Sequence, residues 1–268
     1  MSDLTSEKIR RSVRDTYAAA AKAASQSCCA PRGSAESCCG PTEMSAETRS
    51  RGVGYGAEDL AAAPEGSNMG LGCGNPTAIA ALKPGETVLD LGSGGGFDCF
   101  LAARQVGSEG RVIGIDMTPE MIEKARANAA KVEVANVEFR LGEIEHLPVA
   151  DSSVDVVMSN CVINLSADKP AVYREIFRAL KPGGRIAISD MVALAPLPEE
   201  LATDLKMVAS CIGGAAMVVE ISTWLEEIGF AAINVDINEG VAEAIEDWAP
   251  GRRANDYVAA TNIEAIKP

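Results

Sequence analysis

The chain has 268 residues, of which 24 are basic and 38 acidic, giving a net charge of −14 at pH 7. Nucleic acids and anionic membranes require basic surface, so we expect neither as a partner. The sequence has no apolar run of about 18 residues, which argues against a transmembrane helix. The N-terminus, MSDLTSEKIRRSVRDTY, carries charges throughout and lacks the apolar core of a secretory signal. We therefore expect a cytoplasmic protein whose thiols are reduced.

Residues 1–75 predict an N-terminal helix followed by a flexible, cysteine-rich segment. Apolar residues recur with helical spacing over residues 3–25. Residues 26–57 are rich in Ser, Gly and Pro, a composition typical of mobile segments, and contain the similar tetrapeptides CCAP and CCGP.

Residues 76–268 alternate strand-like and helix-like segments, which indicates β-α-β units. The fold class is therefore α/β, with a mostly parallel sheet flanked by helices. The predicted strands cover residues 86–91, 111–115, 136–141, 154–159, 184–190, 230–236 and 254–261. The predicted helices cover residues 97–106, 118–130, 169–180 and a long helical stretch at 198–228. We interpret the segment around 191–228 as an insertion that caps the substrate.

Residues 88–96 read VLDLGSGGG, a buried strand that ends in a glycine loop. Its glycines permit unusual backbone angles and the close approach of a ligand, and the loop opens a helix whose N-terminal amides attract anions. Ligands of open α/β sheets bind beyond the carboxyl ends of the strands, where this loop lies. A dinucleotide fingerprint requires a third glycine at the position that Phe97 occupies, so that reading fails.

The order hydrophobic-Asp-hydrophobic-Gly-x-Gly-x-Gly in this loop, with the LKPGG turn before the strand at 184–190, resembles the Rossmann-like class I methyltransferases. The resemblance implies S-adenosylmethionine as cofactor. It places Asp90 near the methionine amine, Asp116 on the ribose hydroxyls and Asn160 near the methyl group. The cofactor-binding residues that it implies are Asp90, Gly92, Ser93, Gly94, Asp98, Asp116, Met117, Gly142, Glu143, Ile144 and Asn160.

Eight cysteines need an explanation in a chain for which a disulfide framework is not expected. Structural zinc is disfavoured, because the chain has no C-x-x-C pair and its one histidine, His146, reads as an ordinary loop residue. Three cysteines lie in loops or caps near the expected binding edge: Cys73 in LGCGNP, Cys161 in SNCVINL and Cys211 in ASCIGGA. Free cysteines are most often small buried hydrophobes, and we interpret Cys99 in this way.

The segments LGCGNP, DLGSGGGFDC, GIDMTPEM, SNCVINL and SCIGGA occur in this order over residues 68–216 and resemble the arsenite methyltransferase family. The resemblance implies arsenic detoxification by methyl transfer from S-adenosylmethionine to trivalent arsenic, supplied as arsenite or an arsenic-thiol conjugate and assisted by a thiol reductant. Cys73, Cys161 and Cys211 would be the catalytic residues, since soft trivalent arsenic prefers thiolates. Three thiolates leave arsenic a lone pair to attack the methyl group, so catalysis rests mainly on alignment and needs no general base.

Two alternatives to this hypothesis stay open. A class I methyltransferase of a small organic molecule, such as a quinone, would keep the glycine loop but give no reason for the three cysteines. A cysteine-rich metalloid-binding protein with a vestigial cofactor fold would not need the intact loop or Asp116. The number of methyl groups is also open, because many members of the family carry a further C-terminal region, as are the roles of Cys28, Cys29, Cys38 and Cys39.

Overall fold

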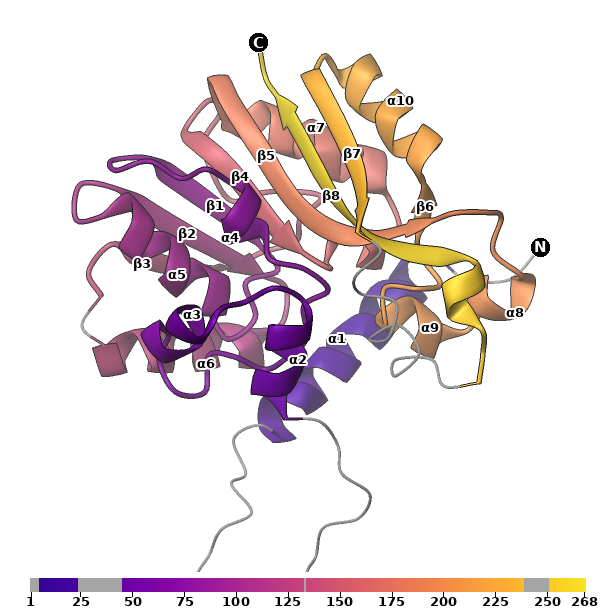
Figure 1. The fold of residues 1–268 in the computed structure, drawn as a ribbon, viewed down its shortest axis with the longest axis horizontal. Coiled ribbons are helices and arrows are strands. Elements are labelled where there is room, and N and C mark those ends of the chain that lie inside the picture. Colours follow the sequence, from indigo (N-terminus) through magenta and orange to yellow (C-terminus); the bar gives the residue numbers. More distant parts are fainter. Residues whose placement is uncertain (1–4, 24–44, 133, 239–250) are drawn as a thin grey trace, which may run out of the picture.

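The computed structural model describes residues 5–23, 45–132, 134–238 and 251–268 (Figure 1). Its helices are α1 (Ser6–Ala23), α2 (Ala46–Gly52), α3 (Ala57–Ala62), α4 (Pro76–Ile79), α5 (Phe97–Val106), α6 (Pro119–Val132), α7 (Lys169–Ala179), α8 (Glu199–Ala202), α9 (Leu205–Ala209) and α10 (Val218–Ile228), with 3-10 turns η1 (Ile163–Leu165) and η3 (Ala254–Asp256). Its strands are β1 (Thr87–Leu91), β2 (Arg111–Asp116), β3 (Val137–Leu141), β4 (Val154–Asn160), β5 (Leu180–Ala193), β6 (Ala216–Met217), β7 (Ala231–Asn238) and β8 (Val258–Ile266).

The strands form one sheet in the order β3-β2-β1-β4-β5-β8-β7, with β6 paired to the end of β5. Strands β1 to β5 are parallel, whereas β8 runs antiparallel between β5 and β7. The strand order reverses between β1 and β4, which is where open α/β sheets open a crevice for a ligand. This is the expected Rossmann-like methyltransferase sheet.

Alternate residues of each inner strand enter two hydrophobic cores, one on each face of the sheet. Leu89 of β1 packs in the core that α7 and α10 cover, while its neighbour Val88 packs in the core beneath α4, α5 and α6. Because both faces are covered, the inner strands β1 and β4 are mostly apolar, and their polar residues include Asp90 and Asn160 near the carboxyl ends. Among the described residues, no helix is long and apolar enough to cross a membrane.

A third hydrophobic cluster lies at the carboxyl edge of the parallel strands and joins the N-terminal helix to the rest of the chain. Val13 of α1 is buried there with Phe97, Met191 and Ile212. Figure 1 shows α1 lying across this edge, below the sheet, and its contacts run from α6 to α9. The helix therefore covers the edge at which the glycine loop ends.

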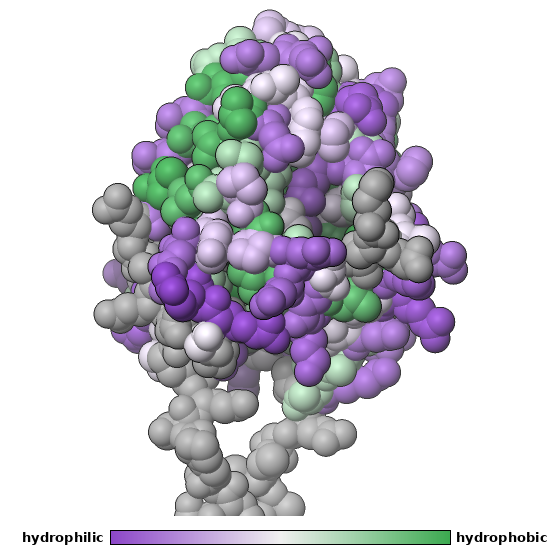
Figure 2. Space-filling model, turned by 90° about the vertical axis from the view of Figure 1, so that its right-hand side faces the viewer, coloured by the Kyte–Doolittle hydropathy of each residue, from purple (hydrophilic) through white to green (hydrophobic). Residues whose placement is uncertain are grey.

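The side of the molecule that carries α8 to α10 is drawn in Figure 2 and is mostly hydrophilic, as an acidic chain predicts. Hydrophobic residues gather on its upper part. Large apolar side chains that stay exposed include Val219 of α10 and Ile237 of β7.

Three expectations about local structure are wrong in detail. The predicted helix at 198–228 is broken into α8, α9, the short strand β6 and α10, and a turn at Gly213 and Gly214 separates α9 from β6. The predicted last strand at 254–261 begins later, since residues 254–256 form η3. The segment predicted to be mobile contains the helix α2, which Ser45 caps by accepting from the Thr48 amide. The paired cysteines Cys28, Cys29, Cys38 and Cys39 lie outside the described residues.

Candidate active site

A cavity opens at the switch point between β1 and β4, beneath α1. The residues that line it come from the glycine loop, from the ends of β1, β2 and β4, and from segments that precede the sheet. Of the predicted cofactor residues, those lining it are Asp90, Gly92, Ser93, Gly94, Asp98, Asp116, Met117, Ile144 and Asn160. Nine of the eleven residues that were predicted to bind the cofactor therefore line one cavity.

Two predicted residues do not line this cavity. Gly142 follows β3, and its amide donates to the Asp116 carbonyl. Glu143 instead forms an ion pair with Arg10 of α1, at 3.5 Å. Its neighbour Glu145 lines the cavity and accepts a hydrogen bond from the Ser166 hydroxyl. Glu143 therefore contacts the cavity only indirectly, through Arg10, which lines it.

The glycine loop is shaped by contacts that leave no room for side chains. Gly92 has a φ of +70°, and a Cβ there would overlap the Val162 side chain. The Gly94 amide donates to Asp116 Oδ2 at 3.0 Å, and the Thr118 amide donates to Asp116 Oδ1 at 2.8 Å. The carboxylate of Asp116 thus joins the loop to the start of α6 and keeps acceptor capacity for a hydroxyl group.

Two buried carboxylates, Asp90 and Asp98, and the half-buried Asp116 face the same cavity. Burial raises the pKa of Asp98 to about 6, although hydrogen bonds from Tyr55 and Asn160 oppose the shift. Burial also raises the pKa of Asp90 and of Asp116, since loss of water disfavours the charged form. A cation would restore the ionised carboxylates.

The cavity also presents a hydroxyl group without a partner. Ser93 Oγ is buried and makes no hydrogen bond within the described structure. A buried hydroxyl group normally has a partner, so this atom is suited to a polar ligand atom. Together with the carboxylates, it fits S-adenosylmethionine, which carries an ammonium, a sulfonium and ribose hydroxyls.

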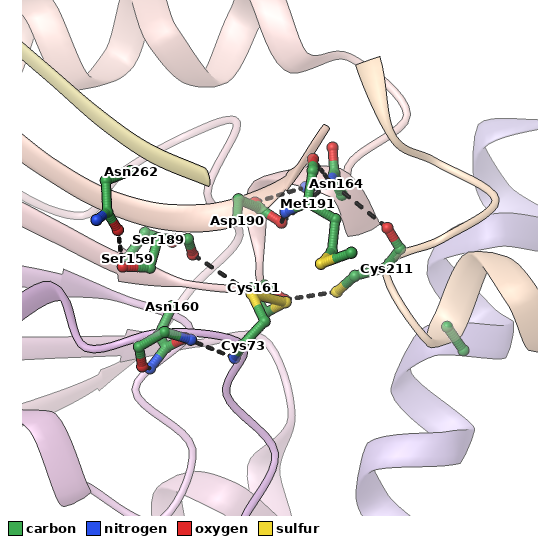
Figure 3. The surroundings of a disulfide bond; sticks show 12 residues. Cys73, Ser159, Asn160, Cys161, Asn164, Ser189, Asp190, Met191, Cys211 and Asn262 are labelled. Carbon is green, nitrogen blue, oxygen red and sulfur yellow. Dashed lines mark hydrogen bonds between the residues drawn. A yellow bond between two sulfur atoms is a disulfide. The ribbon is translucent and has the colours of Figure 1, made fainter. Parts of the chain in front are cut away.

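The three cysteines singled out from the sequence converge beside this cavity (Figure 3). Cys73, from the loop before α4, forms a disulfide with Cys161, which follows β4. The Cys211 thiol, from the turn after α9, donates to the Cys161 carbonyl at 2.8 Å, and Figure 3 shows its sulfur pointing toward the disulfide. All three are buried, whereas the expected hydrophobic residue Cys99 lies apart under the sheet and donates to Asp90.

The disulfide corrects our expectation of free thiols at Cys73 and Cys161. The bond joins the loop before α4 to the residue that follows β4, at the carboxyl edge of the parallel strands. Cys161 and Cys211 both have left-handed backbones, with φ of +59° and +62°. Non-glycine residues rarely adopt this conformation, and such strain is commonly concentrated at functional sites.

A buried carboxylate that the sequence analysis missed lies next to the sulfurs. An oxygen of Asp190, near the end of β5, lies within 4.8 Å of the sulfurs of Cys73 and Cys161. Asp190 accepts hydrogen bonds from the Asn164 amide and side chain and from the Met191 amide. Burial raises the pKa of Asp190 to about 6, while these hydrogen bonds and Lys169 lower it. Its position as the last residue of the strand predicted at 184–190 was the signal that could have found it.

Two tyrosines also join the site from segments read only as helix and flexible chain. The Tyr17 hydroxyl on α1 donates to the Ala209 carbonyl at 3.3 Å, beside Cys211. Burial raises its pKa well above the usual value. The Tyr55 hydroxyl donates to Asp98 Oδ1 at 2.6 Å. Neither contact can be predicted from the sequence around the tyrosine, because its hydrogen-bond partner is distant along the chain.

Known proteins resemble this chain in sequence and in structure. Residues 82–229 match the family described as a methyltransferase domain. The whole chain is 49% identical to an arsenite methyltransferase of Halobacterium salinarum and covers 69% of it. It is 41% identical to the human arsenite methyltransferase over 53% of this chain and 40% of that protein. The crystal structure of an arsenic(III) S-adenosylmethionine methyltransferase from Chlamydomonas reinhardtii matches with a TM-score of 0.61 and 30% identity, over 82% of this chain and 73% of that one.

Proposed function

Because the chain belongs to the arsenite methyltransferase family, a class I S-adenosylmethionine-dependent family, we propose that it methylates trivalent arsenic bound by Cys73, Cys161 and Cys211. The observation that carries the proposal is the convergence of these cysteines. Two of their sulfurs are bonded, and the third thiol lies 2.8 Å from the Cys161 carbonyl. Only Cys161 both lines the cofactor cavity and belongs to this cluster.

The residues that line the cofactor cavity differ in the chemical group of the cofactor that each would contact. S-adenosylmethionine supplies an electrophilic methyl group on a sulfonium. Asp90 and Asp98 offer buried carboxylates to its cationic groups, and Asp116 offers an acceptor to the ribose hydroxyls. Ser93 contributes the unpaired hydroxyl. Met117 and Ile144 offer apolar cavity wall for the adenine ring.

The protein's part in the transfer step is to hold arsenic and exclude water. Cys161 lies at the boundary between the cysteine cluster and the cavity, so it would hold arsenic next to a cofactor bound in that cavity. Three thiolates leave the arsenic lone pair free as the nucleophile, and no protein base is then required for transfer. Helix α1 covers the cavity, since Ile9, Val13 and Tyr17 line it. The cover excludes water, which strengthens interactions between the buried carboxylates and a cation.

The substrate is arsenite or its thiol conjugate. A thiol reductant keeps Cys73 and Cys161 reduced so that both can bind arsenic. Arsenic needs Cys73 and Cys161 as thiolates, so their disulfide must first be reduced. Thiolate exchange with a reductant opens such a bond through a mixed disulfide. We propose that a small thiol supplies these electrons and also carries arsenic in exchangeable form.

The direct test incubates the reduced full-length chain with arsenite and S-adenosylmethionine, and identifies arsenic species by chromatography and mass spectrometry. Methylated arsenic and stoichiometric S-adenosylhomocysteine are expected. Arsenite that is bound but never methylated, by a chain shown to bind the cofactor, would refute the proposal.

A further inference from the structure

The sequence LGCGNP surrounds Cys73 with glycines, and the structure supplies the reason. A Cβ on Gly72 would lie 2.5 Å from Asn160 Nδ2, and a Cβ on Gly74 would lie 2.5 Å from Ser189 Cβ. Real Cβ atoms do not approach other atoms so closely. The backbone on both sides of Cys73 is therefore packed closely against two side chains, Asn160 at the end of β4 and its strand neighbour Ser189 on β5.

The side chain of Asn160 holds this backbone by three hydrogen bonds. Its Oδ1 accepts from the Cys73 amide at 3.0 Å and from the Gly74 amide at 3.3 Å. Its Nδ2 donates to the Gly74 carbonyl at 2.8 Å. Figure 3 shows Asn160 beside Cys73, with the contact to the Cys73 amide dashed. The side chain of Asn160 thus fixes the position of the backbone that carries the Cys73 thiol.

The same amide nitrogen reaches the cofactor cavity. Asn160 Nδ2 donates to the Tyr55 hydroxyl at 2.9 Å and lies 3.3 Å from Asp98 Oδ2. Tyr55 in turn donates to the other oxygen of Asp98. Asn160, Tyr55 and Asp98 all line the cavity, as does Gly72.

These contacts compete. An amide nitrogen carries two hydrogens, while three acceptors surround Asn160 Nδ2. A cation in the cavity would pair with Asp98 and weaken the pull of that carboxylate on the amide. The hydrogens would then be available to Tyr55 and to the Gly74 carbonyl, which belongs to the Cys73 loop.

We propose that Asn160 is a positioning residue that couples occupation of the cofactor cavity to the placement of Cys73 for arsenic. Cofactor binding orders the Cys73 loop through Asn160, and arsenic bound at Cys73 tightens cofactor binding through the same contacts. Coupling between two ligands is reciprocal, so either direction can be measured. This inference rests on the proposed arsenic site.

The experiment measures S-adenosylhomocysteine binding to the reduced full-length chain by calorimetry, without and with saturating arsenite. The wild type should bind S-adenosylhomocysteine at least about fivefold more tightly with arsenite, the lower end of typical coupling. In Asn160→Ala this factor should fall below about two. In Tyr55→Phe, which keeps the ring packed against Phe97, it should fall partway. Thermal unfolding confirms that each variant is folded.

Asn164→Ala is the matched control. Asn164 also anchors the cysteine cluster, through Asp190 and the Cys211 carbonyl, but it does not line the cofactor cavity. This variant should weaken arsenite binding and keep the coupling factor. A wild type without coupling, or an Asn160→Ala variant that retains it, overturns the inference. Equilibrium dialysis of arsenite separates the two proposals, because a wild type that binds no arsenite at these cysteines refutes the proposed function itself.

Discussion

The Cys211 thiol donates a hydrogen bond of 2.8 Å to the main-chain carbonyl of Cys161, although 50 residues separate them in sequence. Both residues have left-handed backbones. Burial raises the pKa of the Cys211 thiol well above its usual value, so it is protonated in this state. This hydrogen bond holds the Cys211 sulfur, the third sulfur of the proposed arsenic site, beside the sulfurs of Cys73 and Cys161.

Replacement of Cys161 or Cys211 by serine should abolish arsenic methylation and leave cofactor affinity within about threefold. Loss of a soft thiolate removes arsenic affinity, whereas the carboxylates and Ser93 that serve the cofactor are untouched. Product analysis gives the first quantity and calorimetry with S-adenosylhomocysteine the second. A Cys161→Ser variant that methylates arsenite at the wild-type rate would show that the site is misassigned.

Two further cysteine variants sharpen this result. Cys99→Ala should retain methylation, because Cys99 is buried under the sheet and contacts Asp90 and not the other sulfurs. Cys73→Ser should lose methylation of arsenite but spare a later round, since a methylated arsenic needs fewer thiolates. That difference is measured by offering arsenite and monomethylated trivalent arsenic as separate substrates.

Methylation should require prior reduction of the Cys73–Cys161 disulfide. Chain prepared with this bond closed should bind S-adenosylhomocysteine but form no methylated arsenic, and a dithiol should restore turnover as two thiols appear. Thiol counting with a chromogenic disulfide runs beside product analysis. Equal rates before and after reduction would contradict the requirement for both thiolates.

Tyr17→Phe should lower the rate of arsenic methylation several-fold and destabilise the fold by about 1 kcal/mol, the usual contribution of one hydrogen bond. Its hydroxyl ties α1 to the Ala209 carbonyl, two residues before Cys211. Thermal unfolding and initial rates measure the two effects.

Tyr257→Phe is the control for Tyr17→Phe. It removes the same group from a tyrosine that packs at the edge of the same hydrophobic cluster but does not line the cofactor cavity. Its rate should match that of the wild type. Similar losses in both variants would indicate a general packing effect and remove the specific role of the α1 hydroxyl.

Cofactor affinity should fall about tenfold between pH 7 and pH 5. Asp98 has its pKa raised to about 6 by burial, so the carboxylate is ionised above this pH and protonated below it. A cationic ligand binds the ionised form better, hence affinity rises with pH through 6 and then levels off. Binding near pH 6 should release a proton, which calorimetry in buffers of different ionisation enthalpy detects.

Asp98→Asn should flatten this pH dependence and weaken binding at pH 7, because the group no longer ionises. An unchanged pH profile in the variant would assign the proton to another group. Asp90 is the next candidate, since burial also raises its pKa.

Sequence alone determined the fold and the cofactor. Strand and helix periodicity are local properties, and the glycine loop of residues 88–96 specifies a backbone shape that few ligands match. The three cysteines that we propose bind arsenic were also singled out from sequence, because each lies in a loop or cap segment near the expected binding edge. Nine of the eleven predicted cofactor residues line one cavity, because they lie at or after the carboxyl ends of neighbouring parallel strands.

Only the tertiary structure decided which distant groups complete the site. Asn160 was expected at the methyl end of the cofactor, yet its bonds to Cys73 depend on how the loop before α4 returns to the sheet. Tyr17, Tyr55 and Asp190 join the site from three separate segments. Hydrogen bonds and burial depend on neighbours 26 to 192 residues away, and no local pattern encodes those neighbours.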